Sequence, residues 1–184
     1  LLTENNEVNM EFHAETDRPT PVNLTNHTYF NLAGENSGPV YDQVLQIQAD
    51  AITETDEEHI PTGGLTDVSG TAFDFREPHP IGERINLLQM GYDDNFVLND
   101  YSGKLARRIT AFDPGSGRVL EISTTEPGVQ LYTSNWFDGS MVGKSGKPYH
   151  KHEAFALETQ HFPDSMNQPA FPSVIIRPGE KYFS

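Results

Sequence analysis

Turn-forming residues interrupt this sequence so often that long helices have little room. The 184 residues include 15 Gly and 13 Pro, and between these breaks lie short runs in which hydrophobic and polar residues alternate, such as Val8–Ala14 and Val44–Ala49. Alternation of this kind is typical of strands with one buried face. With 35% hydrophobic residues, a chain of this length can bury one core. We therefore predict an all-β fold, an antiparallel β-sandwich, in one domain covering residues 1–184.

The same patterns place the other elements. Residues 50–70 are acidic and rich in turn formers, so we interpret them as a long surface connection. A helical turn is plausible only in residues 81–90. Asp113–Gly117 should close a hairpin between its flanking strands. The further predicted strands are residues 22–32, 71–75, 92–98, 105–112, 118–124, 129–135, 154–160 and 174–177.

Charge and cysteine content exclude several functions. The chain carries 12 Lys and Arg against 27 Asp and Glu, a formal net charge of -15. Such a surface repels nucleic acids, acidic membranes and phosphorylated ligands, so we expect a neutral or cationic small molecule as partner, with no nucleic acid and no membrane. Cysteine is absent, which rules out thiol chemistry and thiolate metal sites. The sequence leaves the oligomeric state open.

Two residues stand out as candidates for proton transfer. His27 lies on a strand face whose other members, Asn23, Thr25, Tyr29 and Asn31, can all form hydrogen bonds. Histidine exchanges protons near neutral pH. Glu158 follows a row of small residues on its strand face, which leaves space for a ligand beside a possible general base. The alternatives, a hydrogen-bonded histidine on a wet sheet face and a solvated glutamate, stay open from the pattern alone.

Other polar and aromatic residues could line the same surface. Asp93 and Asp94 are adjacent and should face opposite ways, so at most one of them serves a common groove. Gln130 shares a face with Tyr132 and Ser134, a row that could bind hydroxyl groups or simply face water. Trp136 could stack on a sugar ring, although we favour a position in the core.

Histidine spacing and glycosylation sequons provide two weaker signals. His150 and His152 would share a strand face and, with His161, could contribute to a metal site. The surrounding Gly and Pro favour loops instead, so we predict no metal. Sequons begin at Asn23 and Asn26, but a glycan there would crowd the polar strand face. We interpret both as unmodified and expect a cytoplasmic protein.

One long motif makes the interpretation specific. Pro21–Gly34, read as PVNLTNHTYFNLAG, resembles the signature of the galactose mutarotase (aldose 1-epimerase) family almost residue for residue. Further motifs of that family follow in family order at Ile60–Gly63, Gly70–Arg76, Gly91–Phe96, Pro127–Tyr132, Leu157–Gln160, Phe162–Ser165 and Arg177–Glu180. Over its whole length the chain is similar to the carboxyl-terminal part of such enzymes.

The resemblance implies a mutarotase-like supersandwich that interconverts the α and β anomers of free galactose or glucose without a cofactor. It assigns His27 as the acid that protonates the ring oxygen and Glu158 as the base for the anomeric hydroxyl. Asp93, Gln130 and Tyr29 would hold the sugar. Two alternatives stay open: a carbohydrate-binding fragment that does not turn its ligand over, and a glycoside hydrolase with Asp93 and Glu158 as its carboxylates.

The chain departs from the family pattern in three places. Asp94 stands where many relatives have His, and we expect a small effect because it faces away from Asp93. Gln160–Phe162 replaces a more usual Asn-Trp pairing, which should alter the groove wall near Glu158. Family members also carry an amino-terminal part with an arginine and a further histidine that contact the sugar. We therefore expect the domain to be incomplete at its amino terminus.

Overall fold

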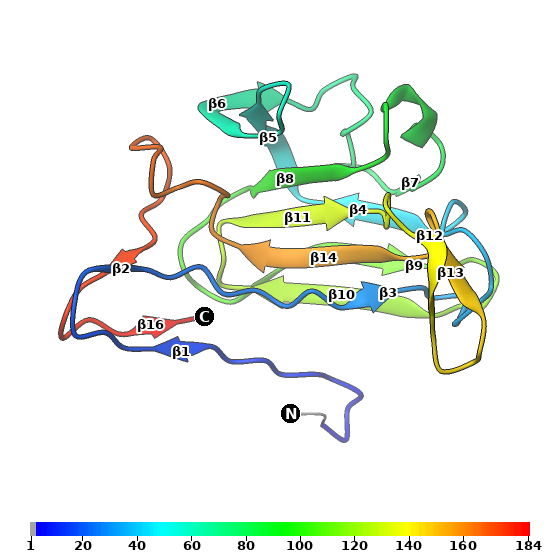
Figure 1. The fold of residues 1–184 in the computed structure, drawn as a ribbon, viewed down its shortest axis with the longest axis horizontal. Coiled ribbons are helices and arrows are strands. Elements are labelled where there is room, and N and C mark those ends of the chain that lie inside the picture. Colours follow the sequence, from blue (N-terminus) through cyan, green and yellow to red (C-terminus); the bar gives the residue numbers. More distant parts are fainter. Residues whose placement is uncertain (1–2) are drawn as a thin grey trace.

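The computed structural model describes residues 3–184, and strands joined by turns make up its regular structure (Figure 1). The only helical element in these residues is the 3-10 turn Ile85–Leu87, inside the segment where a helical turn was expected. The all-β prediction is confirmed. The strands are β1 (His13–Ala14), β2 (Thr20–Pro21), β3 (Tyr29–Phe30), β4 (Val44–Ile47), β5 (Ala49–Thr55), β6 (Pro61–Asp67), β7 (His79–Pro80), β8 (Asp93–Leu98), β9 (Ala106–Phe112), β10 (Val119–Thr124), β11 (Gly128–Tyr132), β12 (Asp138–Val142), β13 (Pro148–His150), β14 (Phe155–Gln160), β15 (Ile175–Ile176) and β16 (Tyr182–Phe183).

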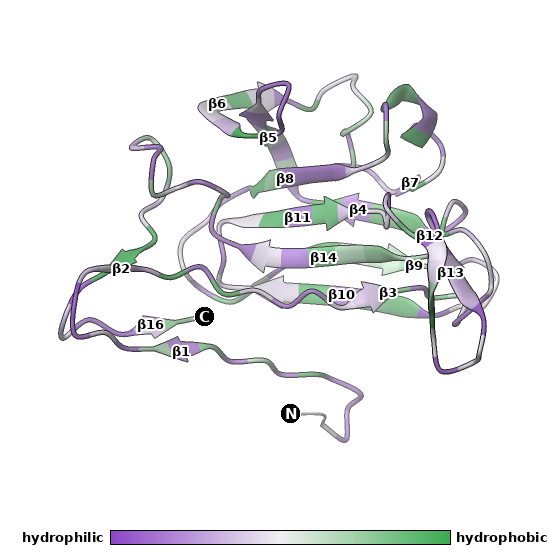
Figure 2. Ribbon diagram, viewed as in Figure 1, coloured by the Kyte–Doolittle hydropathy of each residue, from purple (hydrophilic) through white to green (hydrophobic). Residues whose placement is uncertain are grey.

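Two antiparallel sheets enclose the core. A six-stranded sheet has the order β3-β14-β11-β8-β5-β6, and a four-stranded sheet has the order β10-β9-β4-β7. Leu45 and Ile109 of the smaller sheet join Phe96, Leu131 and Phe155 of the larger sheet in one buried cluster. Figure 2 shows hydrophilic and hydrophobic stretches along β8, β11 and β14. The larger sheet therefore buries one face and leaves the other available for a ligand.

Strand register fixes which residues share that outer face. Gln130 on β11 pairs with Glu158 on β14 and with Asn95 on β8. One row further along, Tyr132 pairs with Ala156 and with Asp93, and Ala156 pairs in turn with Tyr29. Successive residues of a strand point to opposite faces, so these rows lie on the side away from the buried Val129 and Leu131.

Several predicted strands and one predicted hairpin are confirmed. β4, β8, β9, β10, β11 and β14 each fall within or close to their expected ranges. The β9–β10 hairpin turns where predicted, because Asp113 accepts a hydrogen bond from the backbone N–H of Ser116 at 2.6 Å. Gly117 then adopts φ = 72°, a conformation that glycine enters without steric cost.

The prediction of a surface connection over residues 50–70 was wrong. This segment forms the β5–β6 hairpin at the edge of the six-stranded sheet. Asp56 makes the turn by accepting hydrogen bonds from the backbone N–H groups of Glu58 and Ile60 at 2.9 and 3.0 Å. Ile52 and Thr53 are buried. Burial of these residues against the core stabilises the two strands, although the composition of the segment is acidic and rich in turn formers.

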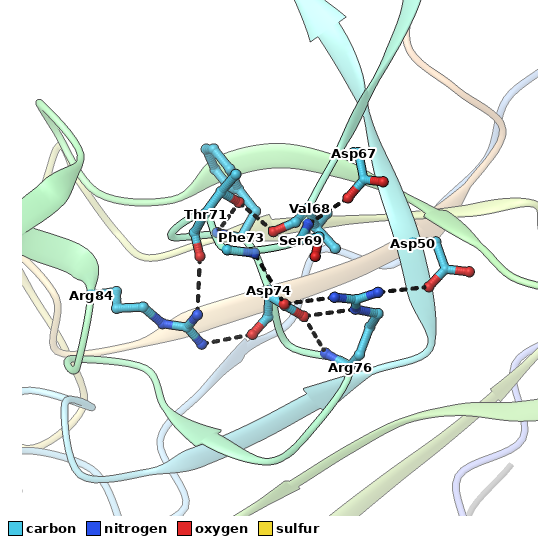
Figure 3. A network of polar contacts seen from close by, with 10 residues as sticks. Asp50, Asp67, Val68, Ser69, Thr71, Phe73, Asp74, Arg76 and Arg84 are labelled. Atoms are coloured by element: carbon cyan, nitrogen blue, oxygen red, sulfur yellow. Dashed lines mark hydrogen bonds and ion pairs between the residues drawn. The ribbon is translucent and has the colours of Figure 1, made fainter.

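The prediction of an extended segment over residues 71–75 was also wrong, because hydrogen bonds fold it into a turn (Figure 3). Thr71 donates its hydroxyl to the carbonyl of Val68 at 2.7 Å. Arg84 donates to the carbonyls of Thr71 and Asp74 at 3.0 and 2.6 Å. Arg76 binds both carboxylate oxygens of Asp74 at 2.8 Å and so holds the pKa of that carboxyl well below its usual range.

The strands predicted in the amino-terminal region are much shorter in the structure. Residues 8–14 do not form a half-buried strand: Val8 and Met10 are 61% and 48% exposed, and the strand found in this range is β1 alone, which pairs with β16. In residues 22–32 only β3 joins the sheet, because the Asn26 side chain accepts a hydrogen bond from the N–H of Thr28 and turns the backbone locally. The pattern also missed the β12–β13 hairpin.

Candidate active site

A groove of about 460 Å³ lies on the outer face of the six-stranded sheet. It contains all five side chains to which the sequence resemblance assigned a role, from β3, β8, β11, β14 and the segment before β3. The lining residues are His27, Tyr29, Asp93, Gln130, Tyr132, Trp136, Glu158, Gln160 and Pro163. The fold thus brings together residues that lie far apart in the sequence.

His27 and Glu158 form a close pair within this groove. Nε2 of His27 lies 3.2 Å from Oε1 of Glu158, with 47% of the histidine side chain and 12% of the glutamate side chain exposed. Burial raises the pKa of Glu158, His27 lowers it and the charge of Asp93 raises it further, and the net effect is a raised pKa. A buried carboxyl of this kind can exchange a proton closer to neutral pH than an ordinary glutamate.

Asp93 and Gln130 form a hydrogen-bonded pair beside the glutamate. Nε2 of Gln130 donates to Oδ1 of Asp93 at 2.9 Å. Oε1 of Gln130 is buried and has no hydrogen-bond partner among residues 3–184. Neither side-chain polar atom of the neighbouring Asn95 is paired within that range. Sequence reasoning missed Asn95, although its position two residues after Asp93 places it on the same strand face.

Aromatic side chains border the groove. The ring of Tyr29 lies 4.8 Å from that of His27, and the ring of Tyr132 lies 6.1 Å from it. Burial raises the pKa of both tyrosines, so both hydroxyls keep the proton that a hydrogen-bond donor needs. Trp136 is 66% exposed and lines the groove, so the core position favoured from the sequence was wrong. Ser134 is buried, where it donates to the carbonyl of Ala154.

Asp94 lies outside the groove, as the alternation predicts. It pairs with Leu131 in the ladder, whereas Asp93 pairs with Tyr132. Burial raises the pKa of Asp94 to about 6, and its carboxylate accepts a hydrogen bond from the backbone N–H of Asp93 at 3.0 Å. The two aspartates therefore occupy opposite faces of β8, and only Asp93 can reach a ligand in the groove.

Two of the three histidines weighed as metal ligands, His152 and His161, bond to other groups. Nδ1 of His152 donates to the carbonyl of Thr133 at 2.9 Å, and Nδ1 of His161 lies 2.5 Å from the carboxylate of Glu126. Residues 3–184 contain no group of three or more His, Cys, Asp or Glu side chains that could hold a metal ion. In the same range no helix is long and apolar enough to cross a membrane.

Comparison with known proteins places the chain in a family. The family model described as aldose 1-epimerase matches residues 1–184. The galactose mutarotase of Bos taurus is 49% identical over 179 residues, which are 96% of this chain and 52% of that protein. The aldose 1-epimerase of Escherichia coli K12 is 38% identical over 192 residues, covering 100% of this chain and 54% of that protein.

A solved structure gives the same answer. The crystal structure of an aldose epimerase homologue from C. elegans superposes with a TM-score of 0.81 at 31% identity, covering 95% of this chain and 55% of the other. The chain spans about half the length of the curated relatives it matches. The matched family model covers every residue, so this chain belongs to the aldose 1-epimerase family.

Proposed function

We propose that the protein is an isomerase that interconverts the α and β anomers of a free aldose such as galactose or glucose. The observation that carries this proposal is the 3.2 Å separation of the His27 imidazole and the Glu158 carboxylate inside the groove. In a cyclic aldose the ring oxygen and the anomeric hydroxyl are bonded to the same carbon. An acid for one oxygen and a base for the other must therefore be neighbours, as these two side chains are.

The reaction needs only proton transfer. Nε2 of protonated His27 gives its proton to the ring oxygen while Glu158 takes the proton of the anomeric hydroxyl. The bond between the anomeric carbon and the ring oxygen breaks, and its electron pair stays on the ring oxygen, which becomes a hydroxyl. The anomeric carbon becomes an aldehyde, which can rotate about its bond to the next carbon. Ring closure reverses both proton transfers and yields either anomer.

The remaining groove residues suit a neutral sugar. Asp93 offers a carboxylate oxygen as an acceptor for sugar hydroxyls, and Gln130 orients that carboxylate by donating to its Oδ1. Tyr29 offers a hydroxyl donor, and the exposed face of Trp136 offers an apolar surface for the ring. These contacts would hold the anomeric carbon against His27 and Glu158. A net charge of -15 favours a free aldose over a sugar phosphate.

We also propose that the protein works in the cytoplasm. The support is the side chain of Asn23, the first residue of one glycosylation sequon. Its amide nitrogen donates to the carbonyl of His161 at 2.9 Å, and its oxygen accepts from the N–H of His161 at 3.0 Å. A glycan on that nitrogen would disturb this contact.

Polarimetry of freshly dissolved sugar tests the proposal. We expect the protein to accelerate the equilibration of α-galactose or α-glucose in proportion to the protein concentration. The two controls are buffer alone and heat-unfolded protein, and both should show only the uncatalysed rate. Calorimetric titration with each sugar should accompany the assay. Sugar binding without any acceleration would contradict the enzyme and support a binding module, and release of nitrophenol from a nitrophenyl galactoside would support a hydrolase.

A further inference from the structure

The segment that carries His27 has little support from the sheet. Between β2 and β3, residues 22–28 belong to no strand. β3 itself pairs with β14 at only two residue pairs, Phe30 with Phe155 and Tyr29 with Ala156. The β3–β14 ladder holds the segment on the carboxyl side of His27. On the amino side, β2 pairs with β15, and the N–H of Val22 donates to the carbonyl of Val174 at 2.8 Å. Neither contact joins the segment to the end of β14, so a further attachment is needed to fix the imidazole against Glu158.

Asn23 supplies that attachment. Its side chain closes a two-bond ring with the backbone of His161, accepting from the N–H at 3.0 Å and donating to the carbonyl at 2.9 Å. His161 directly follows β14, the strand that carries Glu158. We call this pair of hydrogen bonds between Asn23 and His161 the clamp. The clamp and the β3–β14 pairing join the same two segments, one on each side of the His27–Glu158 contact.

The His161 end of the clamp is held by a buried polar cluster. Nδ1 of His161 lies 2.5 Å from Oε2 of Glu126, and the hydroxyl of Tyr182 donates to Oε1 of the same carboxylate at 3.1 Å. Glu126 is only 6% exposed. A carboxylate so far removed from water is stable only when its hydrogen-bond donors stay in place, so the cluster resists displacement of any member.

These contacts have a consequence for the proposed reaction, on whose assignment of His27 and Glu158 the inference rests. We propose that Asn23 and His161, braced by Glu126 and Tyr182, are positioning residues that set the His27–Glu158 separation. None of the four lines the groove, so they act through the backbone and not by touching the sugar. His161 belongs to the Gln160–Phe162 segment, which departs from the usual family sequence. In this chain the departure gives Glu126 a histidine partner that supports the Asn23 contact.

The kinetic test uses the full chain with Asn23→Ala, which removes both hydrogen bonds of the clamp. We expect kcat to fall about 10- to 100-fold with KM within about twofold, because misplacement of a reacting group by about 1 Å has costs of this size. Asn23→Asp keeps the acceptor for the His161 N–H and should retain more of the rate. The matched control is Asn99→Ala, which removes an amide contact to the N–H of Asp50 outside the groove and should leave kcat unchanged. Equal kcat in Asn23→Ala and wild type would overturn the proposal.

A second measurement separates failure of this inference from failure of the proposed function. Because His27 lowers the pKa of Glu158, displacement of the imidazole should raise that pKa further, which ¹³C NMR titration of the carboxyl detects without any turnover. An inactive wild type would refute the function, and the titration would still decide the positioning role.

If Asn23→Ala does not fold, Tyr182→Phe keeps the ring and removes one donor to Glu126. It should raise the same pKa to a smaller extent, and an unchanged titration in the folded variant would refute the inference.

Discussion

Nε2 of His27 lies 3.2 Å from Oε1 of Glu158, and the two side chains reach this contact from different kinds of structure. Glu158 stands on β14, which pairs with strands on both sides. His27 stands on an irregular segment just before the edge strand β3. The rigid partner is the proposed base, and the proposed acid depends on contacts outside the sheet. This asymmetry underlies the predictions below.

Replacing His27 should slow catalysis more than it weakens binding. His27→Asn removes the proposed acid and keeps a polar side chain, so kcat should fall about 10²- to 10⁴-fold, the usual contribution of general acid catalysis. KM should change little. Steady-state polarimetry measures both constants, with His13→Asn, outside the groove, as the control. An increase in KM at unchanged kcat would reduce His27 to a sugar-binding residue.

The acid limb of the pH profile of kcat/KM should reflect the ionisation of Glu158. The base acts when ionised, so kcat/KM should rise with pH through the pKa of Glu158, which burial raises above the ordinary glutamate value and the charge of Asp93 raises further. Asp93→Asn removes that charge and should move the limb to lower pH, while KM increases because a sugar contact is lost. A limb that stays in place would show that Glu158 does not control the rate.

Trp136 should matter for binding and not for folding. Since its side chain is 66% exposed, Trp136→Ala should change the free energy of unfolding by no more than about 0.5 kcal/mol, as for other surface substitutions. Loss of a stacking surface should raise KM about 5- to 10-fold, equivalent to about 1 kcal/mol. Chemical denaturation and polarimetry measure the two effects. A loss of several kcal/mol in stability at unchanged KM would restore the core interpretation.

Asp94 should make the fold less stable as pH rises from about 4 to about 6. Its folded-state pKa of about 6 lies above the ordinary value of 3.8. Below about pH 4 the carboxyl is protonated in both the folded and the unfolded state. Above about pH 6 it is ionised in both states, and folding must then bury the charge, which costs free energy. The penalty of about 2–3 kcal/mol follows from about 1.4 kcal/mol per pKa unit. Asp94→Asn should remove it and raise the denaturation midpoint at pH 7, with exposed Asp42→Asn as control. An equal or lower midpoint would contradict this account.

Local pattern predicted the faces of the central strands well. Alternation alone put Glu158 on a strand face with small residues and Gln130 beside Tyr132. The ladder confirms both, because Gln130 pairs with Glu158 and Tyr132 pairs with Ala156. A regular strand has few ways to distribute its side chains, so polar residues at every second position define one face. The turn residues of Asp113–Gly117 likewise predicted the β9–β10 hairpin, because their conformational preferences are local.

Features that depend on distant partners could not be predicted in this way. The hairpin of β5 and β6 looked like a loop, because its acidic residues face solvent and few of its residues, such as Ile52 and Thr53, are buried. The exposure of Trp136 depends on where the chain turns after β11. The partner of His161 is Glu126, which lies in the connection between β10 and β11. No local pattern connects those two residues, since only the packed sheet brings them together.

The most direct test of the account is Glu158→Gln, which removes the proposed base and keeps the shape of its side chain. Polarimetry with α-galactose and calorimetric titration with the same sugar should be run on wild type, on this variant and on Glu57→Gln, an exposed glutamate in the turn between β5 and β6. We predict that Glu158→Gln binds the sugar about as tightly as wild type and loses at least about 100-fold in kcat, while Glu57→Gln behaves as wild type. Wild-type turnover in Glu158→Gln would contradict the central claim that Glu158 is the base.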